Sequence, residues 1–306
     1  MTIKNLVDSF LDEIEKIRRY SSQTCRAYRN DLSQFLDFCN ELNTTEIGSV
    51  SEKMIRKYVV SLNEQHLLTT SVSRKLSALR SLFNYLQKNN YISLNPLSGV
   101  VNPRIKRTLP EVISFEEFQK IPSEIVKKKQ LTVQKNSLHN TSDNSNLYLS
   151  VVELLYSCAL RVSELCNLNY GDIDFNNNSV RVLGKGSKVR IVPIGNESIK
   201  ILKLYLDERH NLKSKSPLFI SSGGIRLYPR YVYKIVNEFL SKVSDIKKKS
   251  PHILRHSAAT HMLDRGADLL AVKEILGHEN LSTTQIYTHV SIERLKKIHK
   301  QAHPKS

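Results

Sequence analysis

Arginine, histidine and tyrosine residues recur near the end of the chain, in an order that suits chemistry on a phosphodiester. His252-x-x-Arg255 comes first, Gly277-His278 follows, and Tyr287 comes last. An arginine binds a phosphate through two parallel hydrogen bonds, a histidine transfers protons near neutral pH, and a tyrosine hydroxyl can act as a covalent nucleophile. These residues predict phosphodiester cleavage without a metal ion or another cofactor.

The spacing of these residues indicates how helices would hold them. His252 lies about one helical turn before Arg255, so both should project from one face toward the same phosphate. Ser282 and Gln285 fit a capping box, which predicts a helix start that holds Tyr287 in its first or second turn. Gly277 is expected to end a helix in a left-handed cap just before His278.

A metal site is the alternative interpretation of the histidines. His252, His256 and His261 follow one another at short spacing. Zinc sites of known spacing, however, also need a cysteine or carboxylate ligand at a set distance, and none occurs here. We therefore expect no metal.

The charge of the chain points to a polyanionic partner. The 306 residues include 46 Lys and Arg against 29 Asp and Glu, a net charge of +17. Such a charge favours nucleic acid, because neutralised phosphates release condensed counterions, although a solvated basic surface or anionic lipid is the alternative. No Asp or Glu occurs from His66 to Pro110, and this span holds a group of basic residues: Arg74, Lys75, Arg80, Lys88, Arg104, Lys106 and Arg107.

Apolar periodicity predicts four helices in the first hundred residues. Their apolar stripes include Ile17 at the end of the first and Leu42 at the end of the second, which begins after Ser21-Ser22. The fourth has the clearest stripe: Val72, Leu76, Leu79, Phe83 and Leu86. This stripe leaves Arg74, Lys75 and Arg80 on other faces, free to meet DNA, unless they serve only solubility.

The rest of the chain predicts a linker and a second domain. We expect a helical domain over 1–102, a basic, proline-bounded linker over 103–112 and a catalytic domain over 113–306. In the last, a helix should start at Ser114, a polar exposed loop should run from Lys127 to Asn146, and alternating valines around Gly184 predict a β-hairpin. The fold class is mainly α with a small antiparallel sheet.

The cysteines and the N-terminus indicate the compartment. Cys25, Cys39, Cys158 and Cys166 lie in apolar segments without paired spacing, as expected for reduced, buried thiols. No run of 18 apolar residues occurs, and acidic residues interrupt the N-terminus, so we expect a cytoplasmic protein without a membrane partner.

The ordered motifs resemble those of the tyrosine recombinase (phage-integrase-type) family, with the Xer-type site-specific recombinases most similar. The resemblance covers nearly the whole chain, and its main motifs are Leu160-Arg161-Val162-Ser163-Glu164-Leu165, Gly184-Lys185-Gly186, His252-x-x-Arg255-His256, Leu276-Gly277-His278 and the Tyr287 segment. The segment 127–146 departs from the family pattern.

The resemblance implies a role for each motif residue. Tyr287 would attack DNA and form a 3′-phosphotyrosyl intermediate, Arg161 and Arg255 would neutralise the phosphate, and His278 would stabilise a phosphate oxygen. Lys185 would protonate the departing 5′ oxygen. His252 is expected to act as a general base or to hydrogen-bond to the phosphate.

Other charged residues near these motifs have two alternative assignments. Lys188 and Arg190 lie close to Lys185, and the alternative is that all three bind DNA phosphates. Glu164 either orients Arg161 or forms a simple helical pair with it. The residues expected to contact DNA directly are Arg74, Lys75, Arg80, Arg104, Lys106, Arg107 and Lys188.

The family likeness also implies an assembly and a cellular task. Two domains would close on double-stranded DNA as a clamp, and a homo- or hetero-tetramer would join two recombination sites. An apolar stripe at Ile292, Leu295 and Ile298 would dock either on a neighbour or on its own domain. The partners could include a second recombinase and a DNA translocase, with resolution of chromosome or plasmid dimers at cell division as the task.

Three other functions fit parts of the pattern. An integrase of a mobile element would use the same chemistry. A sequence-specific DNA-binding protein would need only the basic surfaces, and a type IB topoisomerase-like enzyme would share the phosphotyrosine step. The complete set of candidate catalytic residues and the short helical front domain favour recombination.

Overall fold

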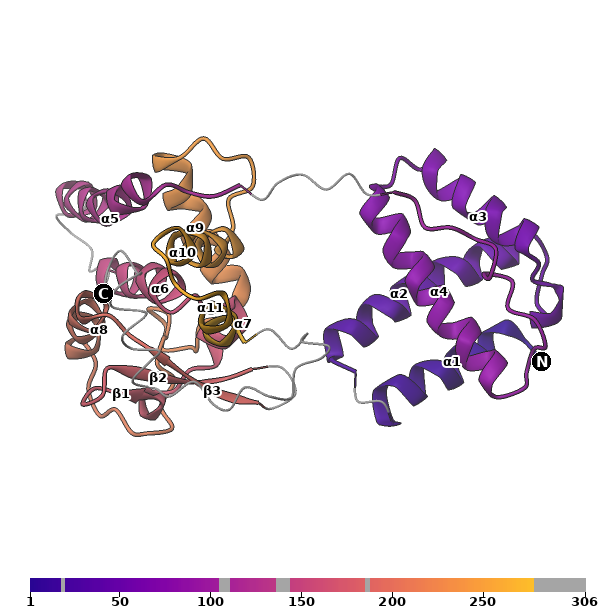
Figure 1. Ribbon diagram of the computed structural model, residues 1–306, viewed down its shortest axis with the longest axis horizontal. Coiled ribbons are helices and arrows are strands. Elements are labelled where there is room, and N and C mark those ends of the chain that lie inside the picture. Colours follow the sequence, from indigo (N-terminus) through magenta and orange to yellow (C-terminus); the bar gives the residue numbers. More distant parts are fainter. Residues whose placement is uncertain (18–19, 105–110, 136–143, 185–187, 278–306) are drawn as a thin grey trace. The chain divides into compact units, whose positions relative to one another are not determined.

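The computed structural model describes residues 1–17, 20–104, 111–135, 144–184 and 188–277; for 126–135 it describes the backbone alone. The chain separates into two compact units, Met1–Thr108 and Leu109–Ser306 (Figure 1). Each unit is described here by itself. The exact domain and linker bounds expected from the sequence stay predictions.

The first unit consists of helices, as predicted. Serines begin two of them: the Ser21 side chain accepts a hydrogen bond from the Thr24 amide, and Ser51 accepts one from Met54. These bonds satisfy amides that a helix start leaves without a partner. The main helices are α1 (Ile3–Asp12), α2 (Ser22–Glu41), α3 (Glu52–Glu64) and α4 (Thr69–Lys88).

Helix α4 contacts α1, α2 and α3, and its apolar stripe is buried throughout. The two outermost residues of the neighbouring stripes are not buried, which corrects the prediction. Ile17 is 75% exposed because the π-helical turn Glu13–Ile17 changes the angular phase after α1. Leu42 is 43% exposed because it caps α2 with non-helical backbone angles.

The second unit combines helices with a small antiparallel sheet, which confirms the predicted fold class. Its helices are α5 (Phe115–Lys135), α6 (Ser145–Ser157), α7 (Val162–Asn167), α8 (Asn196–Asp207), α9 (Pro229–Val243), α10 (Pro251–Asp264) and α11 (Leu269–Leu276). Its strands are β1 (Ile173–Asp174), β2 (Ser179–Leu183) and β3 (Val189–Pro193), paired in the order β1-β2-β3.

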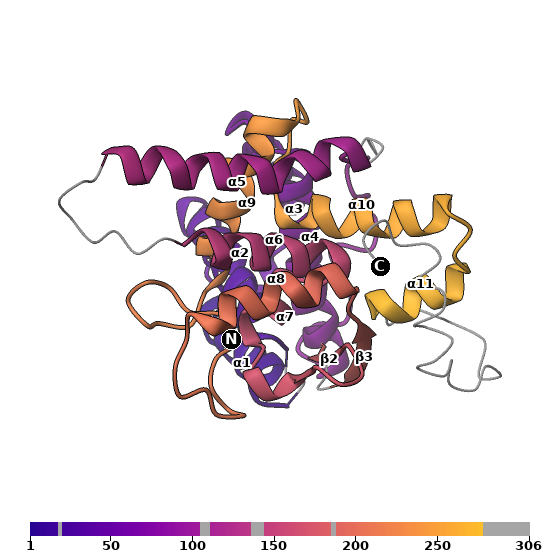
Figure 2. The same cartoon turned by 90° about the vertical axis from the view of Figure 1, so that its left-hand side faces the viewer.

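Helix α6 lies at the centre of this unit. It contacts α5, α8, α9 and α10, and Figure 2 shows it between α5 and α8. All residues of α6 from Ser150 to Ser157 are buried, so this helix has no exposed face over its second half. The helices that carry the candidate active-site residues, α7 and α10, both pack against it.

The polar segment 127–146 is not simply an exposed loop, so that prediction is wrong in part. Helix α5 continues to Lys135, and α6 already begins at Ser145. The lysines and glutamines at 127–135 are good helix formers, and they extend a helix that starts at a capping box between Ser114 and Glu117. Residues 136–143 lie outside the described part.

The predicted hairpin is confirmed, with Val180 paired to Val192 and Val182 to Arg190. In β3, the apolar residues of the alternating pattern, Val189 and Ile191, lie on the exposed face. Val189 is 56% exposed and Ile191 37% exposed, whereas Val192 is fully buried. The inward face of β3 therefore carries Arg190.

All four cysteines are free and buried, as predicted. Burial raises the pKa of the Cys158 and Cys39 thiols to about 12, so these thiols stay protonated at neutral pH. None of the helices that the structure describes is long and apolar enough to cross a membrane. Among the same residues, no group of three or more His, Cys, Asp and Glu is arranged to hold a metal ion.

Candidate active site

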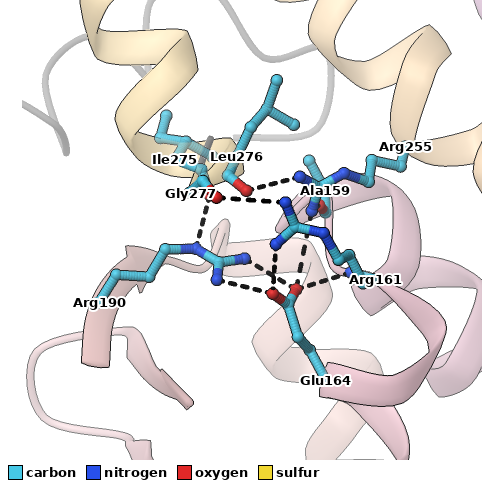
Figure 3. Close-up of polar contacts among 8 residues, drawn as sticks. All are labelled: Ala159, Arg161, Glu164, Arg190, Arg255, Ile275, Leu276 and Gly277. Carbon is cyan, nitrogen blue, oxygen red and sulfur yellow. Dashed lines mark hydrogen bonds and ion pairs between the residues drawn. The ribbon is translucent and has the colours of Figure 1, made fainter. Parts of the chain in front are cut away.

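The buried carboxylate of Glu164 is the centre of the candidate site. Glu164 stands in the first turn of α7, its side chain is 4% exposed, and it accepts a hydrogen bond from the Arg161 amide at 2.7 Å. Three guanidinium groups surround it (Figure 3). Burial raises the pKa of Glu164, but the hydrogen bonds from Arg190 and Arg161 outweigh this effect, so the pKa lies below its ordinary value.

Arg161 is the most exposed of the three arginines, with 33% of its side chain accessible. It precedes α7 as the N-cap residue. Its Nη1 donates to Glu164 Oε1 at 2.8 Å, and its Nη2 donates to the Gly277 carbonyl at 3.1 Å. Glu164 therefore orients Arg161, beyond the simple helical pair that was the alternative.

Arg255 is buried in the first half of α10. It donates through Nη1 to the Ala159 carbonyl at 2.6 Å and through Nη2 to the Leu276 carbonyl at 2.5 Å, and Nη1 lies 3.7 Å from Glu164 Oε2. Burial, followed by the charge of Arg161, lowers the pKa of Arg255 to about 10. The guanidinium thus remains charged at neutral pH.

Arg190 of β3 is the third arginine, and its guanidinium is engaged within the protein; the alternative interpretation, that it binds DNA phosphates, stays open. It pairs with both oxygens of Glu164 at 2.8 Å, and its Nε donates to the Ile275 carbonyl at 2.8 Å. Its side chain is only 12% exposed. No sequence motif predicted this position of Arg190. The only indication was the alternation of a short strand, in which Arg190 faces the side opposite to Val189 and Ile191.

The three arginines bind three consecutive carbonyls at the C-terminal end of α11: those of Ile275, Leu276 and Gly277 (Figure 3). A helix end leaves such carbonyls without intrahelical partners. Gly277 caps α11 with φ 62°, which confirms the left-handed cap expected from the sequence. The chain therefore enters the His278 segment from a fixed point beside Arg161.

His252 lies at the start of α10 and is exposed, three residues before Arg255. Partial burial, followed by the charges of Arg255, Lys248 and Arg161, lowers its pKa below the ordinary 6.5. His252 is therefore neutral at pH 7, the state in which an imidazole accepts a proton. His261 shares a 2.7 Å hydrogen bond with the Tyr156 hydroxyl.

Three of the expected catalytic residues, Lys185, His278 and Tyr287, lie outside the described residues. Their roles stay predictions, as does the docking of the stripe at Ile292, Leu295 and Ile298. Of the six expected catalytic residues, the structure thus brings together Arg161, His252 and Arg255. It adds Glu164 and Arg190 as their neighbours.

The basic residues of α4 are less free than expected. Lys75 is 5% exposed, and its ammonium donates to Asp31 Oδ1 at 3.0 Å and to Gln34 Oε1 at 2.6 Å. The prediction that Lys75 is free to meet DNA is therefore wrong: the helix turns its charge toward a buried carboxylate on α2. Arg74 also pairs with Asp31, but 47% of its side chain is exposed.

The other candidate DNA contacts differ in their surroundings. Arg80 is half-buried and donates to the Asn102 side chain and the Val100 carbonyl. Arg104 and Lys188 are exposed, whereas Lys106 and Arg107 lie outside the described residues. Their DNA contacts stay predictions.

The arginine cluster has the charge and donors that bind a phosphate. Three guanidinium groups and one carboxylate leave a net charge of about +2 in a partly buried site. A guanidinium has five N–H groups, so the bonds of Arg161 to Glu164 and Gly277 leave donors for a ligand on its exposed side. The arrangement suits a phosphodiester whose charge increases in the transition state.

Two family models match the chain. The phage integrase family matches residues 127–294, and the phage integrase N-terminal SAM-like domain matches residues 7–90. The chain is 38% identical to tyrosine recombinase XerC of Thermodesulfovibrio yellowstonii, covering 98% of this chain and 96% of the relative. It is 35% identical to tyrosine recombinase XerC of Staphylococcus aureus, covering 99% and 98%.

Solved structures share the fold. The XerH site-specific recombinase bound to difH, in a pre-cleavage complex, matches with a TM-score of 0.66 and 23% identity over 95% of this chain and 83% of that one. The Tn1549 transposon integrase in complex with circular intermediate DNA matches with a TM-score of 0.68 and 19% identity over 97% and 98%. The chain belongs to the phage integrase family and is a tyrosine site-specific recombinase.

Proposed function

We propose that the chain cleaves and rejoins double-stranded DNA through a 3′-phosphotyrosyl intermediate. The Tyr287 hydroxyl gives its proton to a base, a role for which His252 is the candidate, and its oxygen attacks the phosphorus. The bond from phosphorus to the 5′ oxygen breaks, and that oxygen takes a proton from Lys185 and leaves as a hydroxyl. A 5′ hydroxyl of another strand then attacks the phosphotyrosine and releases Tyr287. The ester conserves the bond energy, so the exchange needs no ATP.

The observation that carries this proposal is the arginine cluster around Glu164. Arg161 and Arg255 would bind the two non-bridging oxygens, whose charge grows as the pentacoordinate transition state forms. The lowered pKa of His252 suits a hydrogen-bonding or general-base role at the same phosphate. His278, which follows the anchored Gly277, would stabilise a phosphate oxygen.

The proposed cellular task is the resolution of chromosome or plasmid dimers in the cytoplasm. The full-length likeness to XerC proteins of different bacteria supports this task over integration of a mobile element. The two units would close on DNA as a clamp, in a tetramer on two sites with half of the protomers active at once. A second recombinase and a DNA translocase are the proposed partners.

A nicked suicide duplex tests the chemistry. Sites are first recovered from genomic fragments of the source organism that the Tyr287→Phe protein retains, and each is then prepared with a nick beside the scissile position. The wild type should form a covalent protein–DNA band on a denaturing gel, and Tyr287→Phe should not. Tyr228→Phe is the matched control, because Tyr228 is an exposed tyrosine of the same unit, and it should keep the band.

The opposite result would change the assignment. Tight binding to the recovered sites without any adduct would favour a DNA-binding protein that does not cleave. Relaxation of supercoiled plasmid without strand exchange between two sites would favour a topoisomerase-like enzyme.

A further inference from the structure

Arg190 joins three elements that carry the candidate site. Its guanidinium comes from β3, pairs with both oxygens of Glu164 on α7, and donates to the Ile275 carbonyl of α11, each at 2.8 Å. These bonds use three N–H groups of one planar fork, which a single ammonium cannot reproduce. Figure 3 shows Arg190 facing Arg161 across the Glu164 carboxylate.

The Arg190 side chain lies against the backbone of Gly277 and close to that of Gly184. A Cβ at Gly277 would lie 3.1 Å from Arg190 Nη1 and 3.2 Å from its Cδ. A Cβ at Gly184, at the end of β2, would lie 3.5 Å from Nη1. The side chain is therefore enclosed by the two segments that lead to Lys185 and to His278.

The charge of Arg190 also affects the two phosphate-binding arginines. Both oxygens of Glu164 are engaged by Arg190, and the Arg161 guanidinium shares one of them. Without Arg190, the buried carboxylate would be balanced by Arg161 and Arg255 alone. Their charge would then be drawn toward Glu164 and away from a bound phosphate.

We infer that Arg190 is a positioning residue for strand cleavage, which acts through Glu164 and the end of α11 and does not touch DNA. It holds β3, Glu164 with Arg161, and the end of α11 in one arrangement, and it leaves the charge of Arg161 and Arg255 available to the phosphate. This inference rests on the proposed function.

Single-turnover cleavage of the nicked duplex tests it. Arg190→Met should slow adduct formation by about 100-fold, the size expected when catalytic groups shift by about 1 Å. The Kd for the same DNA should change by no more than about twofold, because all three nitrogens of the Arg190 guanidinium donate within the protein. Arg190→Lys restores the charge but not the fork, so its rate should lie between the two.

Arg226→Met is the matched control. Arg226 is also half-buried, and it donates to the carbonyls of Cys166 and Leu168 and to Asn169 Oδ1, with no contact to Glu164 in the described structure. Its loss measures the general cost of removing a carbonyl-binding arginine from this unit. Arg226→Met should keep the wild-type cleavage rate within about threefold.

A double variant separates positioning from general stability. If Arg190 acts through Glu164, Arg190→Met should slow cleavage much less in a Glu164→Gln background than in the wild type. Full multiplication of the two effects would overturn the inference, and so would an Arg190→Met protein that cleaves as fast as Arg226→Met. If Arg190→Met melts below the assay temperature, the cleavage rate of Arg190→Lys is compared in the wild-type and Glu164→Gln backgrounds instead. A wild type without any adduct would instead refute the proposed function, and this inference with it.

Discussion

The buried ion pair between Asp31 and Lys75 makes the sharpest prediction about the first unit. The side chains are 1% and 6% exposed, and the Lys75 ammonium lies 3.0 Å from Asp31 Oδ1. Lys75→Met removes this ammonium and leaves the carboxylate with Arg74, which is half-exposed. Asp31→Leu combined with Lys75→Met removes both buried charges.

The expected magnitudes follow from burial. Breaking a buried pair by removing one partner costs about 3–5 kcal/mol, and the remaining Arg74 places Lys75→Met near 3 kcal/mol. This loss corresponds to roughly 150-fold faster amide exchange. The double variant should exchange within about tenfold of the wild type, because replacing both charges by apolar groups is often neutral.

Hydrogen-exchange mass spectrometry of the intact chain measures both values in the peptides of α2 and α4. It reports on this unit alone, which a single melting curve of two units would not. Equal exchange in Lys75→Met and the wild type would refute the reasoning. So would a double variant that exchanges faster than Lys75→Met.

Lys75→Met and a further variant, Arg74→Met, test which of the two residues contacts DNA. Lys75→Met should leave the salt dependence of DNA binding unchanged. Arg74→Met, which removes an exposed charge, should lower the slope of log K against log salt by roughly 0.9 if Arg74 binds a phosphate. A lower slope in Lys75→Met, with unchanged exchange, would restore Lys75 as a DNA contact.

Three further predictions concern the second unit, and hydrogen-exchange mass spectrometry of peptides from this unit of the intact protein measures each. The pKa of Glu164 is lowered below 4.5 in the fold, so its stabilising effect is present above pH 4.5 and is lost as the pH falls through the folded pKa. Glu164→Gln should therefore lower the free energy of unfolding of this unit at pH 7, and the difference from the wild type should shrink at pH 4; a constant difference would contradict it. Gly277→Ala should cost about 1–2 kcal/mol at a left-handed position, and exchange as slow as in the wild type would show that the cap is not strained by a side chain. Ser114→Ala should cost about 1 kcal/mol by removing the oxygen that accepts from the Glu117 amide, whereas Ser123→Ala, a serine further along α5 that does not cap it, should cost less.

The sequence predicted the parts of the fold that depend on neighbouring residues. The stripe of α4, the helix start at Ser21 and the cap at Gly277 all follow from spacing within one helix. The hairpin followed from alternation, although Val189 and Ile191 marked the exposed face of β3. Local patterns predict whether a segment is a helix or a strand better than they predict which of its faces is buried.

Partners that are distant in the sequence could not be predicted. Lys75 is separated from Asp31 by 44 residues, and Arg190 from Glu164 by 26. In the sequence, a lysine or arginine on a polar helix face has the same pattern whether its side chain contacts solvent, DNA or a buried carboxylate. The motifs did predict the neighbourhood of Arg161 and Arg255, and the structure adds the carboxylate and carbonyls that hold them.

The three arginines bind the end of α11 through main-chain carbonyls, so the sequence of this helix and its length affect the site differently. Every residue type offers the same carbonyl, so substitutions at Ile275 and Leu276 that preserve packing leave the arginine bonds unchanged. A one-residue insertion or deletion within α11 is different, because it turns the carbonyls by about 100° around the helix axis. The site should therefore tolerate substitutions in α11 that preserve packing, but not insertions or deletions that change the length of this helix.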